Sequence, residues 1–252
     1  MAPNLKPKTA MFALFTDFTL QGPYVGQLRL ALHGHAPDVP VVDLMHDAPA
    51  FAPDLAAYLL EPICRALPVG CAVIAVVDPG VGGERRAVAV EADGRLFVGP
   101  DNGLLEFVAG RAAQVRCVFL PEADTAVSPS FHARDLFAPW ASLLLKEGLD
   151  NSGLEIVAFP ERGWAEDTPR ILYVDGFGNG WTGIRADMLS DAAVLEVGEQ
   201  ELRRGRTFSD VPRGQGFWYP NSSGLVEVAI NCGRADGILG IGAGDRIRLL
   251  RP

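Results

Sequence analysis

The chain has 252 residues, of which 48% are hydrophobic and 21% charged, with a formal net charge of −9 at pH 7. This length and composition predict a globular protein of one large domain or two modest ones. The acidic balance argues against a nucleic-acid partner, and no apolar run approaches the ~20 residues that a membrane span needs.

The chain opens with "MAPNLKPKTAMF", which lacks the apolar segment of a signal peptide. Its four cysteines are scattered without a CxxC pair, so we expect a reduced, cytoplasmic protein with no zinc framework. Apolar runs then predict strands at 11–16, 39–45 and 71–77, separated by helices within 23–36 and 52–70. In the second helix, Leu55, Leu59, Ile63 and Leu67 have helical spacing, and Pro62 should kink or divide it. This β-α-β-α-β order favours a mainly parallel α/β sheet.

A hairpin is predicted over 86–99, with its turn at Asp93-Gly94. A helix follows near 133–148, with one apolar stripe made of Leu136, Phe137, Trp140, Leu143 and Leu144. The segment 159–170 has mixed charge and no periodicity, which is typical of a linker. Short apolar runs at 171–175, 194–197, 225–230 and 245–250 then predict a small β-barrel or sandwich. We therefore expect an α/β domain over 1–160 and a β-barrel domain over 168–252.

Polar residues lie at or just beyond the ends of the predicted strands of the first domain. These residues are Asp17, Asp43, His46, Asp78, Asp101 and Asn102. Each of them alone is most simply a helix cap or turn residue. In an open parallel sheet, however, ligands bind beyond the carboxyl ends of the strands, so their gathering on one rim indicates a site.

The stretch "VVDPGVGGERR" places Asp78 at the end of the third strand, followed by glycines and two arginines. Its glycines fit neither the dinucleotide-binding fingerprint nor a P-loop, and we interpret them as clearance for a close approach to the backbone. Arg86 begins the next strand and should point away from the side chain of Arg85. His132 lies on a loop before a helix, where a capping or core role is an equal alternative.

Six segments in order resemble the S-adenosyl-L-methionine hydroxide adenosyltransferase family, the SAM hydrolases, which are related to fluorinase and chlorinase enzymes. They are "LFTDFTLQGPYVGQL", "VVDPGVGGERRAVAVE", "FVGPDNGLL", "SFHARDLFAP", "YVDGFGNGWTGI" and "NSSGLVEVAINCG", and the resemblance covers roughly residues 11–250. It implies an N-terminal α/β domain, a C-terminal β-barrel, and a homotrimer whose active sites lie between subunits. It also implies hydrolysis of S-adenosyl-L-methionine to adenosine and L-methionine.

The resemblance further implies particular site residues. Asp78, Arg85 and His132 match the catalytic Asp–Arg–His set of the family, and Asp17 matches the acid that binds the ribose hydroxyls. Further substrate contacts implied in the same way are Phe51, Asp175, Phe177, Asn179, Tyr219 and Ser222. A guanidinium stabilises developing hydroxide, while Asp and His orient the water and accept its proton. No metal and no cofactor are implied.

Two departures from the family pattern bear on specificity. Gly22 stands where the family often has an acid that meets the methionine ammonium group, which leaves Asp175 as the expected partner. The halogenating relatives replace the His and Asp of the set, whereas this chain keeps both, which favours water as the nucleophile. The alternatives are a halide-dependent adenosyl transferase and a non-catalytic protein that binds or senses adenosine.

Overall fold

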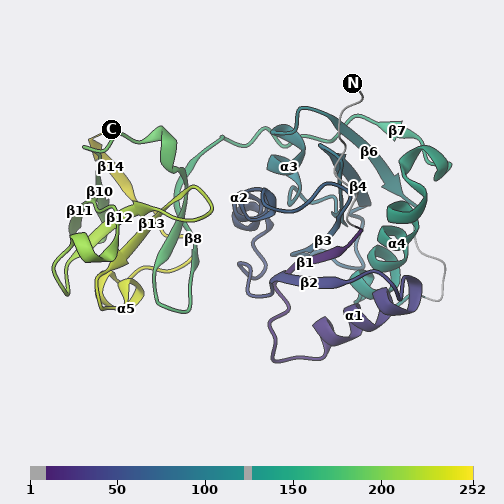
Figure 1. Ribbon diagram of the computed structural model, residues 1–252, viewed down its shortest axis with the longest axis horizontal. Coiled ribbons are helices and arrows are strands. Elements are labelled where there is room, and N and C mark those ends of the chain that lie inside the picture. Colours follow the sequence, from purple (N-terminus) through teal and green to yellow (C-terminus); the bar gives the residue numbers. More distant parts are fainter. Residues whose placement is uncertain (1–9, 122–126, 252) are drawn as a thin grey trace, which may run out of the picture. The chain divides into compact units, whose positions relative to one another are not determined.

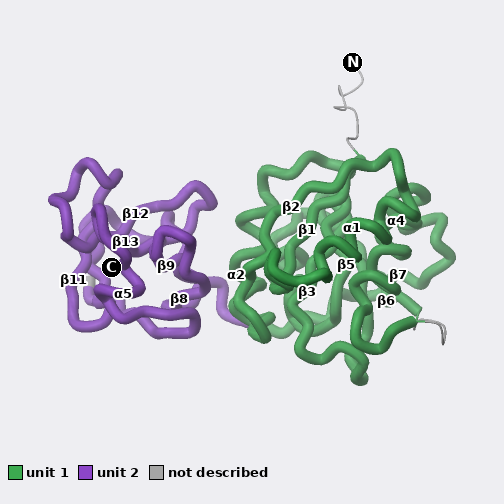
Figure 2. Tube along the Cα trace, turned by 90° about the horizontal axis from the view of Figure 1, so that it is seen from below, with its two compact units in different colours: residues 1–163 green, residues 164–252 purple. Residues whose placement is uncertain are grey.

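The computed structural model describes residues 10–121 and 127–251. The chain forms two compact units, residues 1–163 and 164–252 (Figure 2). Residues 1–9, on which the expectation about a signal peptide largely rests, lie outside the described residues. None of the helices in the described part has the length and apolarity needed to cross a membrane.

Unit 1 is built on a seven-stranded sheet with the order β2-β1-β3-β5-β4-β6-β7. Its strands are β1 (Phe12–Thr16), β2 (Val41–Met45), β3 (Ala72–Val76), β4 (Ala87–Ala92), β5 (Arg95–Pro100), β6 (Val115–Leu120) and β7 (Ile156–Val157). The pairs among β2, β1, β3 and β5 are parallel, whereas β4, β6 and β7 add to the sheet in antiparallel fashion. The sheet is therefore mixed, with the predicted parallel strands in one half.

Strands β1 and β3 are buried along their whole length because helices cover both faces of the sheet. Figure 1 shows α2 and α3 on one side and α1 and α4 on the other. Their bounds are α1 (Tyr24–His35), α2 (Pro53–Cys64), α3 (Glu106–Gly110) and α4 (Ala138–Glu147). The predicted hairpin is confirmed: Asp93 (φ 46°) and Gly94 (φ 74°) connect β4 to β5 through two left-handed residues.

Two details of the predicted helices are wrong. Helix α2 ends at Cys64, two residues after Pro62, and no second helical segment follows, so Leu67 lies outside the helix. The helix continues through Pro62 to Cys64, so this proline lies in its last turn and does not divide it into two helices. Leu143 does not belong to the buried stripe of α4, because 38% of it is exposed.

Unit 2 is a strongly curled seven-stranded sheet with the order β14-β10-β11-β12-β13-β9-β8. Its strands are β8 (Thr168–Val174), β9 (Gly180–Arg185), β10 (Val194–Val197), β11 (Gln200–Arg204), β12 (Gly216–Pro220), β13 (Leu225–Ile230) and β14 (Arg248–Arg251), and α5 is Ala235–Leu239. Trp218, fully buried, packs in its core. The curl brings the segment before β14 back to β8, where the Ile171 N–H donates to the Asp245 carbonyl at 2.8 Å. This curl confirms the barrel-like character predicted for the C-terminal part.

Candidate active site

The side chains of Asp78 and Arg85 form a buried ion pair just beyond strand β3. Their side chains are only 4% and 11% exposed, respectively. Arg85 Nε donates to Asp78 Oδ1 at 3.0 Å, and its Nη2 donates to Asp78 Oδ2. This two-point contact fixes the plane of the guanidinium, which a single hydrogen bond would leave free to rotate.

The glycine loop between these two residues packs closely against the segment that precedes His132. Gly82 has φ +76°, and a Cβ there would lie 2.5 Å from the Pro129 carbonyl oxygen. Both the backbone conformation and the lack of space therefore require glycine at this position. The glycine-rich sequence thus lets the loop that carries Arg85 approach the loop that carries His132.

His132 completes a contact between three residues that are far apart in the sequence. Arg85 Nη2 lies 2.9 Å from His132 Nδ1. Because a guanidinium only donates, Nδ1 must accept, and the proton of the neutral ring is on Nε2. Burial and the positive charge of Arg85 both lower the pKa of His132 below its ordinary value of 6.5. The geometry and the pKa direction therefore agree on a neutral imidazole.

The backbone after His132 has an unusual local form. Residues Ala133–Phe137 make a π-helical turn that continues into α4, and the Ala138 N–H donates to the Ala133 carbonyl five residues earlier. The buried ring of Phe137 lies beneath the Arg85 guanidinium, with Cζ 5.5 Å from the ring centroid. π-Helical turns are frequent at functional sites.

An open cavity of about 140 Å³ adjoins this cluster and is lined by Asp17, Phe51, Asp78 and His132, among others. Burial raises the pKa of Asp17, and the nearby Asp78 adds to the rise. Phe51 has φ +60°, which is uncommon for an aromatic residue, and is 79% exposed. Its N–H points to Asp17 Oδ2 at 3.4 Å. A strained backbone that holds an apolar ring in solvent beside a carboxylate is typical of a ligand contact.

The other polar residues predicted at the rim have partners of their own. Asp43 lies within β2, where it pairs with Arg29 at 2.6 Å and with His46 Nε2 at 3.2 Å. His46 is buried and contacts Thr16 Oγ1 through Nδ1 at 2.8 Å. Arg29 therefore balances the charge of Asp43, and Asp43 does not line the cavity with Asp17 and Asp78.

Asp101 and Asn102 also serve local structure. The Asp101 carboxylate pairs with Arg86 at 3.2 Å and with Arg162 at 2.8 Å. The Asn102 amide donates to the Val77 carbonyl at 2.9 Å, which fixes the chain just before Asp78. Asp101 is thus bound to two arginines, and neither residue lines the cavity with Asp17 and Asp78.

The five remaining predicted residues line one open cavity of unit 2, of about 750 Å³; they are Asp175, Phe177, Asn179, Tyr219 and Ser222. Asp175 Oδ1 accepts the N–H groups of Phe177 and Asn179, each at 2.9 Å, and so shapes the "DGFGN" turn. This turn holds Phe177 79% exposed. The structure therefore groups the predicted residues into two sets, one in each unit.

Sequence reasoning missed Glu227 and Trp181, which line the same cavity of unit 2. Glu227 is 3% exposed and accepts the hydroxyl proton of Tyr219. Burial raises the pKa of Glu227, and the negative charge of Asp175 adds to the rise. The available signal was a single acid inside the otherwise apolar run "LVEVAI".

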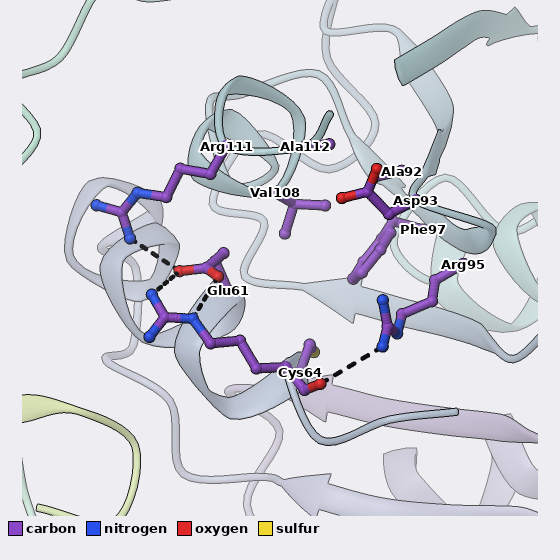
Figure 3. Close-up of a pocket in the computed structure, with 10 residues that line it drawn as sticks. Glu61, Cys64, Ala92, Asp93, Arg95, Phe97, Val108, Arg111 and Ala112 are labelled. Carbon is purple, nitrogen blue, oxygen red and sulfur yellow. Dashed lines mark hydrogen bonds and ion pairs between the residues drawn. The ribbon is translucent and has the colours of Figure 1, made fainter. Parts of the chain in front are cut away.

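A further cavity in unit 1, of about 150 Å³, contains none of the predicted site residues (Figure 3). At its edge, Glu61 accepts hydrogen bonds from Arg65 and Arg111, and Arg95 donates to the Leu67 carbonyl. Burial alone would raise the pKa of Glu61, but the two arginines hold it below its usual value. These contacts tie α2 to its neighbours and pair the charge of Glu61 with two arginines.

All four cysteines are free, and burial raises the pKa of Cys64, Cys71 and Cys117. Among residues 10–121 and 127–251, no three or more His, Cys, Asp or Glu side chains are grouped so that they could hold a metal ion.

Comparisons with known proteins cover both units. Residues 12–153 match the family model described as SAM hydroxide adenosyltransferase N-terminal domain, and residues 169–248 match the corresponding C-terminal domain. An (R)-S-adenosyl-L-methionine hydrolase of Thermus thermophilus is 39% identical over 93% of this chain and 97% of its own length. One from Salinispora tropica is 36% identical over 96% of this chain and 98% of its own length.

Two solved structures share the fold. An uncharacterized conserved protein from Thermotoga maritima has a TM-score of 0.84 at 28% identity and covers 96% of this chain and 100% of its own. A conserved hypothetical protein from Thermus thermophilus has a TM-score of 0.76 at 37% identity, with the same coverage of 96% and 100%.

Proposed function

The chain belongs to the SAM hydroxide adenosyltransferase family, and from this we propose that it hydrolyses S-adenosyl-L-methionine to adenosine and L-methionine. The observation that carries the proposal is the contact between Asp78, Arg85 and His132 beside the cavity that Asp17 also lines. The family relationship supplies the substrate, and these three side chains supply the groups that a water nucleophile needs. The relatives named as (R)-S-adenosyl-L-methionine hydrolases support the same reaction.

In the proposed reaction a water oxygen attacks the ribose 5′ carbon in line with the sulfonium. The C–S bond breaks, its electron pair stays on sulfur as the thioether of methionine, and the water loses one proton. The sulfonium is already a good leaving group, so the protein has to position the nucleophile and remove water from around it.

The proposed roles follow from the hydrogen-bond pattern. His132 carries its proton on Nε2 and donates a hydrogen bond from this N–H to the oxygen nucleophile, while the charge of Arg85 stabilises developing hydroxide. The lone pairs of the Asp78 carboxylate that Arg85 does not use accept a hydrogen from the water. In this arrangement Asp78 is the proton acceptor and His132 is a donor, so the histidine is not a base here.

Binding of the substrate is assigned to both units. We propose that Asp17 accepts the two ribose hydroxyls and that Phe51 packs against the sugar or base. Asp175, Phe177, Asn179, Tyr219 and Ser222 are proposed contacts of adenine and methionine. Asp175 is the proposed partner of the methionine ammonium group, since Gly22 offers no carboxylate.

Replacement of Asp17 by alanine should weaken adenosine binding, because two charge-assisted hydrogen bonds are lost. The expected cost is about 1.5–3 kcal/mol, or roughly 10- to 150-fold in the dissociation constant. Titration calorimetry with adenosine measures it, and Asp17→Asn is the matched variant that keeps shape and loses charge. An unchanged adenosine affinity in Asp17→Ala would refute the ribose role.

Chromatography of the products tests the reaction itself. The purified protein is incubated with S-adenosyl-L-methionine, with and without chloride, and adenosine with methionine is expected in both cases. Release of 5′-chloro-5′-deoxyadenosine would instead assign a halide-dependent transferase. Recovery of unchanged substrate would instead indicate a non-catalytic protein that binds or senses adenosine.

We also propose a homotrimer in which the α/β domain (1–160) of one subunit and the β-barrel domain (168–252) of the next form each site. The grouping of the proposed contacts into one set per unit supports this assembly. Light scattering should give three times the 26.9 kDa of one chain. A fully active monomer would contradict the shared site.

The four free cysteines support the proposed cytoplasmic location, where thiols stay reduced.

A further inference from the structure

His46 contacts the chain on both sides of Asp17, the proposed partner of the ribose hydroxyls. Before Asp17, its Nδ1 atom lies 2.8 Å from the hydroxyl oxygen of Thr16, the last residue of β1. After Asp17, its carbonyl accepts the N–H of Thr19 at 2.6 Å. His46 and Thr16 are buried, with exposed fractions of 6% and 0%. Contacts centred on one buried histidine therefore hold the chain on either side of the acid.

A carboxylate on the far side of the imidazole determines the direction of these hydrogen bonds. Asp43 Oδ1 lies 3.2 Å from His46 Nε2, in a contact of charge that is not directed well enough to count as a hydrogen bond. A negative group beside Nε2 favours the tautomer with the proton on that atom, so Nδ1 accepts the hydroxyl proton of Thr16. Arg29 in turn holds Asp43 at 2.6 Å. The imidazole is thus oriented from both sides.

The Thr16 hydroxyl also shapes the backbone turn that carries Asp17. Its oxygen accepts the N–H of Phe18 at 3.2 Å, which closes a short side-chain turn over residues 16–18. Thr19 has φ +57°, in the left-handed region that a β-branched residue rarely adopts, so this segment depends on tertiary contacts for its shape. His46 fixes the Thr16 hydroxyl, and the turn transmits this constraint to the backbone of Asp17.

The surroundings of Asp17 explain why such a constraint matters. Burial raises the pKa of Asp17, and the negative charge of Asp78 adds to the rise. A carboxylate in these conditions gains hydration and escapes repulsion by turning toward open solvent. The N–H of Phe51 contacts Asp17 Oδ2 at 3.4 Å, which is long for a hydrogen bond. The direction of the carboxylate therefore depends strongly on how its backbone is held.

We propose that His46 and Thr16 are positioning residues that hold the Asp17 carboxylate toward the ribose hydroxyls of the adenosyl group, an inference that rests on the proposed function. Neither side chain lines the cavity with Asp17, so both act through the turn and not by touching the ligand. Two neighbouring hydroxyls can both donate to one carboxylate only when its oxygens face them, because hydrogen bonds are directional. A small rotation of Asp17 therefore weakens binding of the ribose diol and leaves contacts with the base unchanged.

Two pairs of variants test the contact from either end. Thr16→Val and His46→Leu approximately keep the size of the side chain and remove the hydrogen bond between them. Thr16→Ser and His46→Asn retain the hydroxyl and an acceptor near the Nδ1 position, respectively. Calorimetry compares adenosine with 2′,3′-dideoxyadenosine, which lacks both ribose hydroxyls. Circular dichroism gives the melting temperature of each variant.

Thr182→Val, in β9 of unit 2, is the matched control. Thr182 is also fully buried, and its hydroxyl accepts the N–H of Ile184 at 3.3 Å and donates to the Val226 carbonyl at 2.8 Å. The substitution therefore removes the same kind of buried hydrogen bonds from a different unit. It should lower the melting temperature much as Thr16→Val does, but it should keep the ratio of the two affinities.

In Thr16→Val and in His46→Leu, the dissociation constant of adenosine should rise about 3- to 10-fold, the usual effect of losing one hydrogen bond. That of 2′,3′-dideoxyadenosine should stay within about twofold, because this ligand has no ribose diol for Asp17 to bind. Thr16→Ser and His46→Asn should recover most of the affinity for adenosine. A merely structural role would instead weaken both ligands together.

Equal losses for the two ligands, or an unchanged adenosine affinity in folded Thr16→Val and His46→Leu, would overturn the inference. If neither of these variants folds, Asp43→Ala decides the question, because Asp43 is 34% exposed and orients the imidazole. This variant should weaken adenosine about two- to fivefold and leave 2′,3′-dideoxyadenosine unchanged. An unchanged ratio of the two affinities would then overturn the inference.

Failure of the proposed function is a separate result, which the wild type alone reveals. A wild type that releases no adenosine from S-adenosyl-L-methionine would refute the hydrolysis, while calorimetry with the two ligands still tests how Asp17 is positioned. A wild type that binds both ligands equally would refute the ribose role of Asp17 and the inference with it. A wild type that prefers adenosine, with the same preference in Thr16→Val and His46→Leu, would refute the inference alone.

Discussion

Replacement of Arg85 by alanine is expected to lower kcat by about 10²–10³ and to leave the affinity for the substrate nearly unchanged. The guanidinium binds Asp78 at two points and reaches His132 at 2.9 Å, so its removal separates the groups that hold the nucleophile. An interaction made mainly in the transition state lowers kcat and kcat/KM together. Steady-state kinetics on the purified variant measure both.

The same variant should also be less stable. It leaves the Asp78 carboxylate, 4% exposed, without its counter-ion, at a cost of about 3–5 kcal/mol. Kinetics therefore need to be run well below the melting temperature that circular dichroism gives. Arg85→Lys should recover part of the stability and less of the rate, because an ammonium group cannot make the two-point contact.

Arg86 is the natural control for this experiment. Its side chain is 56% exposed, pairs with Asp101 and stacks over Phe119 at 3.4 Å. Arg86→Ala should therefore keep nearly full activity. If Arg86→Ala is inactive while Arg85→Ala keeps full activity, the wrong arginine has been assigned. Full activity of both variants would refute the electrostatic mechanism.

The second large effect is expected at His132. His132→Ala removes the Nε2–H donor and should lower kcat by about 10²–10³, the usual cost of losing one preorganised donor. His132→Gln places an amide N–H close to the same point and should recover part of the rate. Equal rates in His132→Ala and the wild type would exclude a role in the chemical step.

The pH dependence gives an independent check. Since burial and Arg85 hold the pKa of His132 below 6.5, the neutral ring persists through neutral pH and into mild acid. Protonation puts a hydrogen on Nδ1, which then faces the Arg85 donor and breaks that contact. The kcat/KM of the wild type should therefore fall only as pH drops below 6.5 through the lowered pKa. His132→Gln should lack this loss, while the limb due to carboxylates such as Asp17 remains.

Local signals in the sequence predicted much of unit 1 because they depend on near neighbours. The apolar runs of β1 and β3 and the Asp93-Gly94 turn reflect burial and backbone preference within a few residues. Where helix α2 stops was harder to predict, because apolar spacing continued to Leu67 beyond the true end at Cys64. Spacing alone cannot show at which residue a helix ends.

The candidate site was harder to predict from the sequence, because the role of an acidic side chain depends on partners that are distant in the chain. Asp43 and Asp78 both follow apolar runs, yet Arg29 neutralises the first and Arg85 the second. Only the fold shows which of these pairs adjoins a cavity. Glu227 was missed because an acid in a strand ordinarily faces water, whereas this one is 3% exposed and lines the cavity of unit 2.

The π-helical turn at Ala133–Phe137 has a consequence for how this region could change in evolution. Such a turn contains one residue more than an α-helical turn over the same rise along the helix axis. Deletion of one residue here would restore a regular helix and rotate His132 by about 100° relative to the buried side of α4. The fold could survive that deletion, but the imidazole would no longer meet Arg85. Substitutions can therefore accumulate in this turn more readily than changes in its length.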